Sequence, residues 1–225
     1  MIRLKHVTKR YGATQALIDV DLDVARGDSV GLTGPNGSGR TTLLRIVATL
    51  VPPTSGAVEI DGLDVVRDLR TLRPRIAYVG MEPLPAERMT VGEYFRFVLE
   101  GRRRPATGEI VEAAVARAGL DERANSATLS GGLRQRLSLG AALAAAPDVL
   151  LLDDPFRALD AAGRSRFVEW LAEARERGAA IMLATPADDD IAAACTRVAR
   201  FDRGRLTGVS AVVKPPAAAR SVASR

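Results

Sequence analysis

A glycine-rich stretch, GPNGSGRTT at residues 34–42, combines residue types that bind phosphate. It lies between the short apolar run SVGLT and the helical pattern TTLLRIVATL, which we expect to continue to about Leu50, where two prolines follow. Glycines let successive backbone N–H groups turn inward around an anion, and the start of a helix adds partial positive charge. The stretch, called the glycine loop below, therefore predicts a phosphate site. Its predicted nucleotide-binding residues are Gly34, Pro35, Asn36, Gly37, Ser38, Gly39, Arg40, Thr41 and Thr42.

Two acids end a second apolar run, VLLLDD at residues 149–154. Buried parallel strands of this kind bring their carboxyl ends to one edge of a sheet, beside the glycine loop. There the Thr41 hydroxyl and the Asp153 carboxylate would bind Mg²⁺, which prefers oxygen ligands. Asp154 is then the candidate base for an attacking water, and Arg40 is the cation that faces the phosphates. Together these residues predict a nucleoside triphosphate site, with Asp154 and Arg40 as its catalytic residues.

The site needs a scaffold of buried strands, and three short apolar runs that end in small or polar residues predict one. These predicted parallel strands cover residues 29–34, 149–154 and 179–185. By contrast, Ile18, Val20, Leu22 and Val24 alternate with aspartates, which predicts an antiparallel layer with one wet face. Helical patterns replace the strand signals over residues 83–146, so we expect a helical subdomain inserted into an α/β core.

We expect one domain over residues 1–206, in which residues 1–82 and 147–206 form the core around the helical subdomain. A further helix follows the VLLLDD strand and ends at a C-cap glycine, Gly178. The remaining residues, 207–225, are rich in Ala, Ser and Pro and show no periodic pattern. They are therefore predicted to form a mobile tail.

Composition narrows the classes of partner. The 225 residues carry a net charge of +5, and Arg supplies nearly all of the positive charge. Only 4% of residues are aromatic and no basic stripe interleaves them, so no nucleic-acid partner is expected. The basic cluster GRRR at residues 101–104 is predicted to be a solvated loop. The longest apolar stretch, residues 137–152, is interrupted by Gly140, Pro147 and Asp148, so no membrane-spanning helix is predicted.

Several other features lie outside the site motifs. The charged N-terminus, MIRLKHVTKR, lacks the apolar run of a signal peptide, and the single cysteine, Cys195, has no internal partner for a disulfide. Both observations fit a cytoplasmic location. The only histidine, His6, lies in the first strand pattern and is predicted to be structural. Phe167 and Trp170, three residues apart on one helical pattern, are predicted to lie in the core.

The stretch LSGGLRQRL at residues 129–137 resembles the signature sequence of the nucleotide-binding subunits of ATP-binding cassette (ABC) transporters. VTKRYG, with Tyr11, resembles the segment whose aromatic ring stacks on adenine in that family. ALD at residues 158–160 resembles the loop that crosses the dimer interface. The resemblance covers residues 2–206 and implies an α/β fold, namely a P-loop NTPase core of ABC type with an antiparallel β layer and an inserted helical subdomain.

The resemblance also implies cofactors and partners. ABC subunits form a head-to-tail dimer around two ATP molecules, each held by the glycine loop of one subunit and the signature of the other, here Ser130, Gly131 and Gly132. At the start of a helix these residues offer a hydroxyl, N–H groups and a dipole to an anion. The implied cofactors are ATP and Mg²⁺. The implied partners are a second cassette and a transmembrane permease that contacts the helical subdomain and the region around Met81, so the chain would lie peripherally on the cytoplasmic face of the cell membrane.

Four positions depart from the family pattern. The expected Lys, Gln, Glu and His are replaced by Arg40, Met81, Asp154 and Pro186. A guanidinium is broader than an ammonium group, and the shorter Asp draws the carboxylate back by roughly 1.5 Å. Met offers no amide oxygen, and Pro offers no side-chain donor. The loop backbone and the magnesium ligands are retained, so we expect ATP binding to outlast catalysis.

Three functions stay open at this point. The first is an ATP-binding subunit that hydrolyses ATP slowly and powers a permease by nucleotide-driven dimerisation. The second is a catalytically impaired module that supplies its intact signature to a competent partner cassette. The third, a soluble ABC protein acting in translation or DNA maintenance, ranks low because the sequence shows neither a tandem cassette nor a long coiled coil. The substrate and the direction of transport would be set by a permease.

Overall fold

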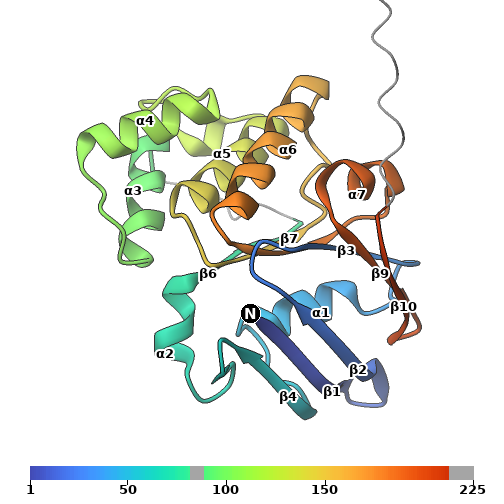
Figure 1. Ribbon diagram of the computed structural model, residues 1–225. Helices are drawn as coiled ribbons and strands as arrows, with labels where there is room; N and C mark the ends of the chain where they lie inside the picture. The colour runs from blue at the N-terminus through green and yellow to red at the C-terminus, as the bar shows by residue number, and fades with distance from the viewer. Residues whose placement is uncertain (82–88, 213–225) are drawn as a thin grey trace, which may run out of the picture.

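The computed structural model describes residues 1–81 and 89–212 and folds them into two β-sheets with helices between and above them (Figure 1). The smaller sheet has the strand order β2-β1-β4-β5, and every neighbouring pair in it is antiparallel. Its strands are β1 (Ile2–Tyr11), β2 (Thr14–Val24), β4 (Ser55–Ile60) and β5 (Leu63–Asp64). This sheet confirms the predicted antiparallel layer.

A bulge in the β1–β2 pair changes the predicted alternation at one end of β2. The alternation holds over residues 20–24, but Leu17 is fully buried where Ile18 was expected to be. Asp19 has a left-handed backbone with φ of +52°, and this conformation lets β2 take in an extra residue opposite β1. The prediction that Ile18 lies on the buried face is therefore wrong, because the bulge inverts the order of faces before Val20.

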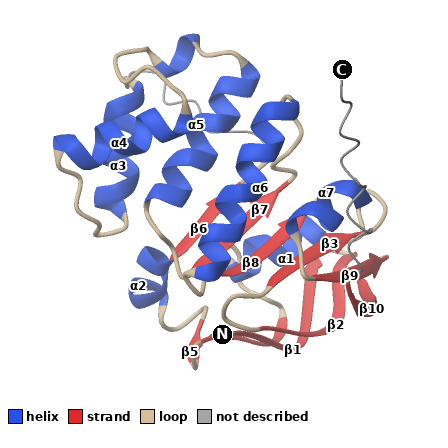
Figure 2. Cartoon of the chain, turned by 45° about the horizontal axis from the view of Figure 1, so that its top comes forward, coloured by secondary structure: helices blue, strands red, loops and turns tan. Residues whose placement is uncertain are grey.

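The larger sheet has the strand order β10-β9-β3-β8-β7-β6 (Figure 2). Its strands are β3 (Ser29–Thr33), β6 (Ile76–Val79), β7 (Val149–Asp153), β8 (Ala180–Ala184), β9 (Arg197–Asp202) and β10 (Arg205–Ala211). The neighbours from β9 to β6 are parallel, whereas β10 is antiparallel to β9. The three predicted parallel strands are confirmed as β3, β7 and β8.

Strand β10 corrects the predicted tail. Residues 207–211 form the second half of β10 and pair with β9, so the boundary predicted at Thr207 is wrong. The turn between the two strands uses left-handed backbone at Arg203 and Gly204, with φ of +45° and +81°. Two consecutive residues of this kind are typical of a tight β-hairpin, in which the second strand runs antiparallel beside the first. Residues 213–225 of the predicted tail lie outside the described residues.

The helices fall into three groups. Helix α1 (Arg40–Val47) lies between the two sheets, and α2 (Leu69–Leu72) and the 3-10 helix η1 (Arg73–Arg75) lead into β6 (Figure 1). The predicted helical subdomain contains α3 (Val91–Gly101), α4 (Gly108–Ala118), η2 (Ser126–Thr128) and α5 (Gly131–Ala144). Helices α6 (Ala161–Glu176) and α7 (Asp188–Ala194) complete the larger sheet's outer cover. Among the described residues, no helix has both the length and the apolar character needed to cross a membrane.

Two helix ends test the predicted caps. Gly178 has φ of +89° and follows Arg177, the C-cap of α6, which is the left-handed glycine expected at this helix end. Helix α1, however, ends at Val47, before the predicted end at Leu50. Thr49 has a left-handed backbone, φ +61°, and the Leu50 N–H donates to the carbonyl oxygen of Arg45 at 2.9 Å, which closes the helix before the prolines.

Strand β7 separates two hydrophobic cores. Leu150 and Leu152 pack with the helical subdomain, α6 and α7, whereas the residues beside them on the opposite face pack with α1 and the antiparallel sheet. All of these strand side chains are fully buried, as expected for a parallel sheet covered on both sides. Phe167 and Trp170 belong to the helical core with exposed fractions of 1% and 7%, which confirms their predicted place.

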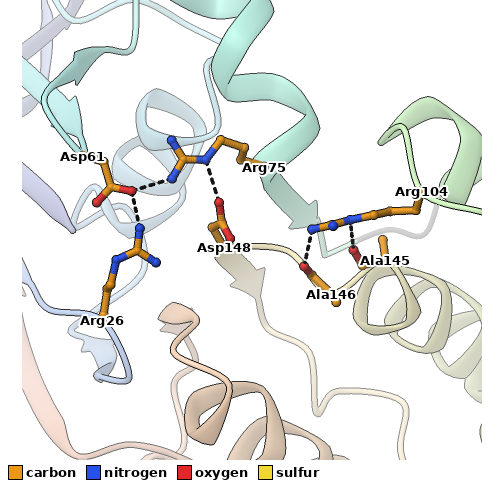
Figure 3. A network of polar contacts seen from close by, with 7 residues as sticks. All are labelled: Arg26, Asp61, Arg75, Arg104, Ala145, Ala146 and Asp148. Atoms are coloured by element: carbon orange, nitrogen blue, oxygen red, sulfur yellow. Dashed lines mark hydrogen bonds and ion pairs between the residues drawn. The ribbon is translucent and has the colours of Figure 1, made fainter.

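An ion-pair network joins the amino ends of β6 and β7 to the antiparallel sheet (Figure 3). Arg75 donates from Nε to Asp148 at 2.6 Å and from Nη2 to Asp61 at 2.5 Å. Arg26 also contacts Asp61 at 2.5 Å. Because Arg75 and Asp148 directly precede β6 and β7, the network fixes the two sheets at the edge opposite the carboxyl ends of these strands.

The basic cluster at residues 101–104 follows α3 as the predicted loop, and its residues are exposed except for the partly buried Arg102, but one of its arginines is anchored. Arg104 donates from Nε and Nη2 to the carbonyl oxygens of Ala145 and Ala146, at 2.9 and 2.8 Å (Figure 3). The last carbonyls of a helix lack partners within it, and Arg104 satisfies those that follow α5. Arg102 is partly buried, and this burial lowers the pKa of its guanidinium.

Candidate functional site

The glycine loop has a backbone that only glycine allows at two positions. Gly34 and Gly39 have φ of +145° and +103°. A Cβ atom at Gly34 would lie 2.1 Å from the carbonyl oxygen of Phe201, and one at Gly39 would lie 2.4 Å from that of Ala16. The loop is therefore clamped between the start of β2 and the end of β9. At Gly34 and Gly39 the backbones approach so closely that no side chain fits.

A buried hydroxyl, that of Ser38, lies in this loop. Ser38 is 2% exposed, and its Oγ forms no hydrogen bond within the described part of the chain. Burying such a group unpaired costs about 1–3 kcal/mol, so orphaned hydroxyls in native proteins usually mark a water or ligand. The orphaned oxygen, the inward-turned glycines and the following helix all fit a bound anion at this loop.

Thr41 and Asp153 meet at the carboxyl end of β7. The Thr41 hydroxyl donates to Oδ1 of Asp153 at 3.1 Å, and the Tyr78 hydroxyl lies 3.5 Å from Oδ2. Asp153 is 4% exposed, and this burial raises the pKa of its carboxyl, while the Thr41 hydrogen bond and the charge of Arg45 act in the opposite direction. Two adjacent oxygens of these types are suitable ligands for Mg²⁺.

Asp154 lies next to this pair with a left-handed backbone, φ +50°. Its N–H donates to the carbonyl oxygen of Ala184 at 2.7 Å, which holds the residue at the end of β8. Partial burial raises the pKa of its carboxyl; Arg157 opposes this shift and Asp190 adds to it. A carboxyl whose pKa is raised toward neutrality is a better proton acceptor than an exposed one, as a general base requires.

Arg40 reaches across the site. Its Nη1 donates to the carbonyl oxygen of Thr185 at 3.1 Å, which joins the start of α1 to the residue after β8. Its charge also opposes the rise in pKa that burial causes in both Asp153 and Asp154. The structure thus brings the predicted magnesium ligands, the predicted base and the predicted cation together at the carboxyl ends of β3, β7 and β8.

Tyr11 lies at the end of β1, opposite Thr14 at the start of β2. The same end of β2 contacts the glycine loop through Ala16, so the ring stands on the hairpin that flanks the loop. It is 47% exposed, with Lys9 Nζ 5.0 Å from the ring centroid. An exposed aromatic ring in this place can stack with a nucleotide base.

The signature residues begin helix α5. Ser130 is its N-cap, and the Ser130 hydroxyl accepts a hydrogen bond from the Leu133 N–H at 3.4 Å. Gly131 faces open space, whereas a Cβ at Gly132 would lie 2.8 Å from the carbonyl oxygen of Ala158. The signature therefore packs against the loop that contains Ala158 and leaves its helix N-terminus open to another molecule.

Two of the altered positions contribute no polar side chain. Met81 is 44% exposed and lines a groove of about 890 Å³ that extends to Asp153. The groove lies between α1, β6, α3 and α5, and Arg45, Arg73 and Arg102 make its lining basic. Pro186 is exposed and follows Thr185 directly after β8.

Sequence reasoning missed several residues around the site. Tyr78 and Arg45 act on Asp153, and Arg45 follows Thr41 by one helical turn, a spacing that could have indicated it. Asp190 is 8% exposed and forms an ion pair with Arg164 at 2.5 Å beside Asp154. No local signal distinguishes Asp190 from the two aspartates that precede it.

His6 lies outside this site, on the outer face of the antiparallel sheet. Its Nδ1 is 2.9 Å from Asp19 and 3.5 Å from Asp21, and all three side chains are exposed. The hydrogen bond to Asp19 is the main reason that the pKa of His6 is raised. Paired with these carboxylates, His6 stabilises the bulged β1–β2 hairpin, which agrees with a structural role.

Comparisons with known proteins agree with this arrangement. Residues 17–157 match the family model described as ABC transporter. The chain is 37% identical over 219 residues to the sulfate/thiosulfate import ATP-binding protein CysA 1 of Rhizobium meliloti, which covers 92% of this chain and 62% of that protein. It is 39% identical over 183 residues to the sulfate/thiosulfate import ATP-binding protein CysA of Escherichia coli K12, and this alignment covers 78% of this chain and 50% of that protein. The chain thus spans between half and two thirds of the length of these relatives.

Solved structures show the same fold. The dimeric bacterial ABC transporter cassette MJ0796 has a TM-score of 0.87 at 27% identity, covering 95% of this chain and 99% of that chain. A dimeric post-hydrolysis state of that cassette, bound to ADP and Pi, has a TM-score of 0.85 at 26% identity and the same coverage. These likenesses confirm the predicted ABC-type fold. ATP-binding subunits of ABC transporters are ATPases, and this chain belongs to the ABC transporter family with the architecture of its ATP-binding subunit.

Proposed function

We propose that the chain binds Mg-ATP at the glycine loop and hydrolyses it slowly to drive a membrane permease. The observation that carries this proposal is the contact between Thr41 and Asp153, 3.1 Å apart at the mouth of a loop shaped for an anion. Both are oxygen ligands, and Asp153 is buried where a carboxylate gains most from a cation partner. Mg²⁺ bound there would neutralise charge on the phosphate oxygens.

The residues of this chain divide into binding and hydrolytic groups. Backbone N–H groups of the glycine loop and the start of α1 hold the phosphates, and Tyr11 supports the base. Asp154 accepts a proton from the attacking water, and Arg40 stabilises charge on the phosphates. Because Arg40 is drawn to Thr185 and Asp154 is shorter than Glu, hydrolysis suffers more than binding.

We further propose that two copies, or this chain and a second cassette, close around the nucleotide. The support is the open N-terminus of α5 with Ser130 and Gly131, which has the residues to bind an anion and faces open space. The related cassette MJ0796 is dimeric. Closure by a partner would supply these donors to the glycine loop of the opposite subunit.

The permease is proposed to contact the groove of about 890 Å³ that Met81 lines. This groove runs from the surface to Asp153, so a segment bound in it lies close to the nucleotide site. The subunit would then act at the cytoplasmic face of the membrane. Because the curated relatives are named as import proteins, we propose import as the direction.

The test is phosphate release from Mg-ATP by the purified chain, run beside a direct binding titration with the same nucleotide. We expect Mg²⁺-dependent binding and slow release, both lost in Asp153→Ala. Absence of ATP binding would overturn the proposal. Binding without any release would favour the alternative in which this chain donates its signature to a competent partner; release that appears only after adding such a cassette would identify that arrangement.

A further inference from the structure

A second cavity lies away from the nucleotide site, and residues of α4, α5 and α6 and of the segments that follow α5 and α6 line it. Figure 2 shows these three helices on the same side of the larger sheet. We call this second cavity the three-helix cavity. Its volume is about 230 Å³, and its lining comes from one face of each helix. Ala114 and Ala118 are four residues apart on α4, and Gly140 and Ala144 are four apart on α5, so each pair shares a helix face. These small side chains leave the space that larger ones would fill.

The mouth of the cavity carries two arginines and too little negative charge to balance them. Arg117 donates from Nη2 to Glu173 at 2.5 Å, and its guanidinium lies 5.6 Å from the centroid of Trp170. Arg177, which also lines the cavity, is 3.8 Å from the same carboxylate of Glu173. One carboxylate therefore serves two guanidinium groups, and Arg177 keeps most of its five donors available.

The size and chemistry of the cavity select a class of ligand. Sites for drug-sized ligands have volumes of roughly 300–1,000 Å³, whereas an apolar cavity of about 150 Å³ is enough for benzene. A volume of about 230 Å³ therefore suits one ring or a short chain with a small head group. The alanines, Leu143 and the buried face of Trp170 form an apolar interior, and a carboxylate matches the planar donors of Arg177.

We propose that the three-helix cavity binds a small carboxylate with an apolar body, such as an aromatic acid. The apolar body lies against Trp170 and Leu143, and the carboxylate pairs with Arg177 at the mouth. Because α4 and α5 belong to the helical subdomain whereas α6 covers the core, a bound ligand contacts both parts and fixes the angle between them. The cavity is thus an effector site that does not depend on the nucleotide loop.

The experiment uses para-fluorobenzoate as the probe and the full chain as the protein. Binding is followed by fluorine NMR line broadening and by the fluorescence of Trp170, the only tryptophan of the chain. We expect a saturable response in both signals, unchanged by excess Mg-ATP. Para-fluorobenzyl alcohol, which has the same ring without the charge, should bind at least about tenfold more weakly, as the loss of one charged hydrogen-bonded pair predicts.

Two variants and a control separate this site from general charge effects. Arg177→Ala should weaken binding at least about tenfold, since its present contact with Glu173 is long and its removal leaves the fold intact. Ala144→Leu should abolish binding by filling the cavity. Arg67→Ala, an exposed arginine before α2, removes the same charge elsewhere and should change nothing. No saturable response, or equal losses in Arg177→Ala and Arg67→Ala, would overturn the proposal, as would an alcohol that binds as tightly as the acid.

Discussion

Arg40 donates a hydrogen bond from Nη1 to the carbonyl oxygen of Thr185, 3.1 Å away, and so ties the first residue of α1 to the end of β8. The contact shows how this chain accommodates an arginine where the family resemblance leads one to expect lysine. The planar guanidinium donates to a backbone carbonyl oxygen beside the site. The compact ammonium group of a lysine would not need this additional acceptor. The charge stays near Asp153 and Asp154, and the hydrogen bond to Thr185 fixes its direction.

Replacing this arginine by lysine should therefore speed hydrolysis. Arg40→Lys frees the cation from Thr185 and lets it approach the phosphates as a compact charge, so turnover should rise while the KM for ATP changes little. Steady-state phosphate release measures both values. Arg40→Gln keeps a donor for Thr185 but removes the charge, and it should bind ATP more weakly. Equal turnover in the two variants would show that the cation at this position is not limiting.

The four altered positions should act as a unit. Restoring Arg40→Lys, Met81→Gln, Asp154→Glu and Pro186→His together should raise turnover at least about tenfold above the best single reversion, because groups that share one transition state are strongly non-additive. Each single reversion still leaves the base, the cation or the γ-phosphate contact out of place. The comparison requires kcat for the four single variants and the quadruple variant. A quadruple variant no faster than Arg40→Lys alone would contradict this account.

Much of the site follows from local sequence. Gly34 and Asp153 could be predicted because each lies at or just beyond the end of a short apolar strand, and parallel strands bring such ends to one edge. Thr41 could be predicted because it begins the helical pattern that follows the glycine loop. The packing of Phe167 and Trp170 follows in the same way from the period of one helix. Local propensity and tertiary structure agree in these elements, so the sequence pattern is sufficient to predict where these residues lie.

The features that escaped prediction depend on contacts between distant residues. Tyr78 reaches Asp153 only because β6 pairs with β7, and the sequence separates the two by 75 positions. Arg104 is anchored because the backbone carbonyls that follow α5 lie beside it. Charge patterning cannot indicate a backbone partner that lies so far away in the sequence. The bulge at Asp19 is another such case, since its register depends on the partner strand.

The contact between Thr41 and Asp153 should control magnesium dependence. Thr41→Val removes the hydroxyl at nearly constant volume, so Mg²⁺-dependent ATP binding should weaken by about tenfold or more, as loss of a charged hydrogen-bonding partner predicts. Titration of nucleotide at several Mg²⁺ concentrations measures the effect. Thr41→Ser retains the oxygen and should behave like the native chain. If Val and Ser variants show the same magnesium dependence, Thr41 is not a ligand.

Gly34 and Gly62 offer a matched test of the clamped loop. Gly62 has φ of +78°, and a Cβ added there would have no other atom within 4 Å, so Gly62→Ala should cost only the left-handed conformation, about 1–2 kcal/mol. At Gly34 the added Cβ would meet the carbonyl oxygen of Phe201 at 2.1 Å. Gly34→Ala should therefore lower the free energy of unfolding by clearly more, on the order of 3 kcal/mol. Urea unfolding of both variants decides this, and equal losses would mean that the loop relaxes away from β9.

The His6 ion pair should stabilise the fold at low pH and lose this effect as the pH rises. The hydrogen bond to Asp19, then the charges of Asp21 and Asp19, raise the pKa of His6 above its ordinary value of 6.5. The folded chain thus holds this proton more tightly than the unfolded chain does, so the stabilisation is complete below pH 6.5 and is lost as the pH rises through the raised value. His6→Asn, chosen because Asn tolerates the positive φ of this position, should destabilise the chain at about pH 5.5 and have little effect at about pH 9.

Urea midpoints of the native chain and the variant at both pH values measure this effect. The chain has no other histidine, so a difference that changes through neutral pH is assigned to His6. Lys5→Gln, an exposed change next to it, removes one positive charge and should lower stability equally at both pH values or not at all. A His6→Asn difference that is the same at about pH 5.5 and at about pH 9 would show that the two carboxylates hold the neutral ring as well as the protonated one.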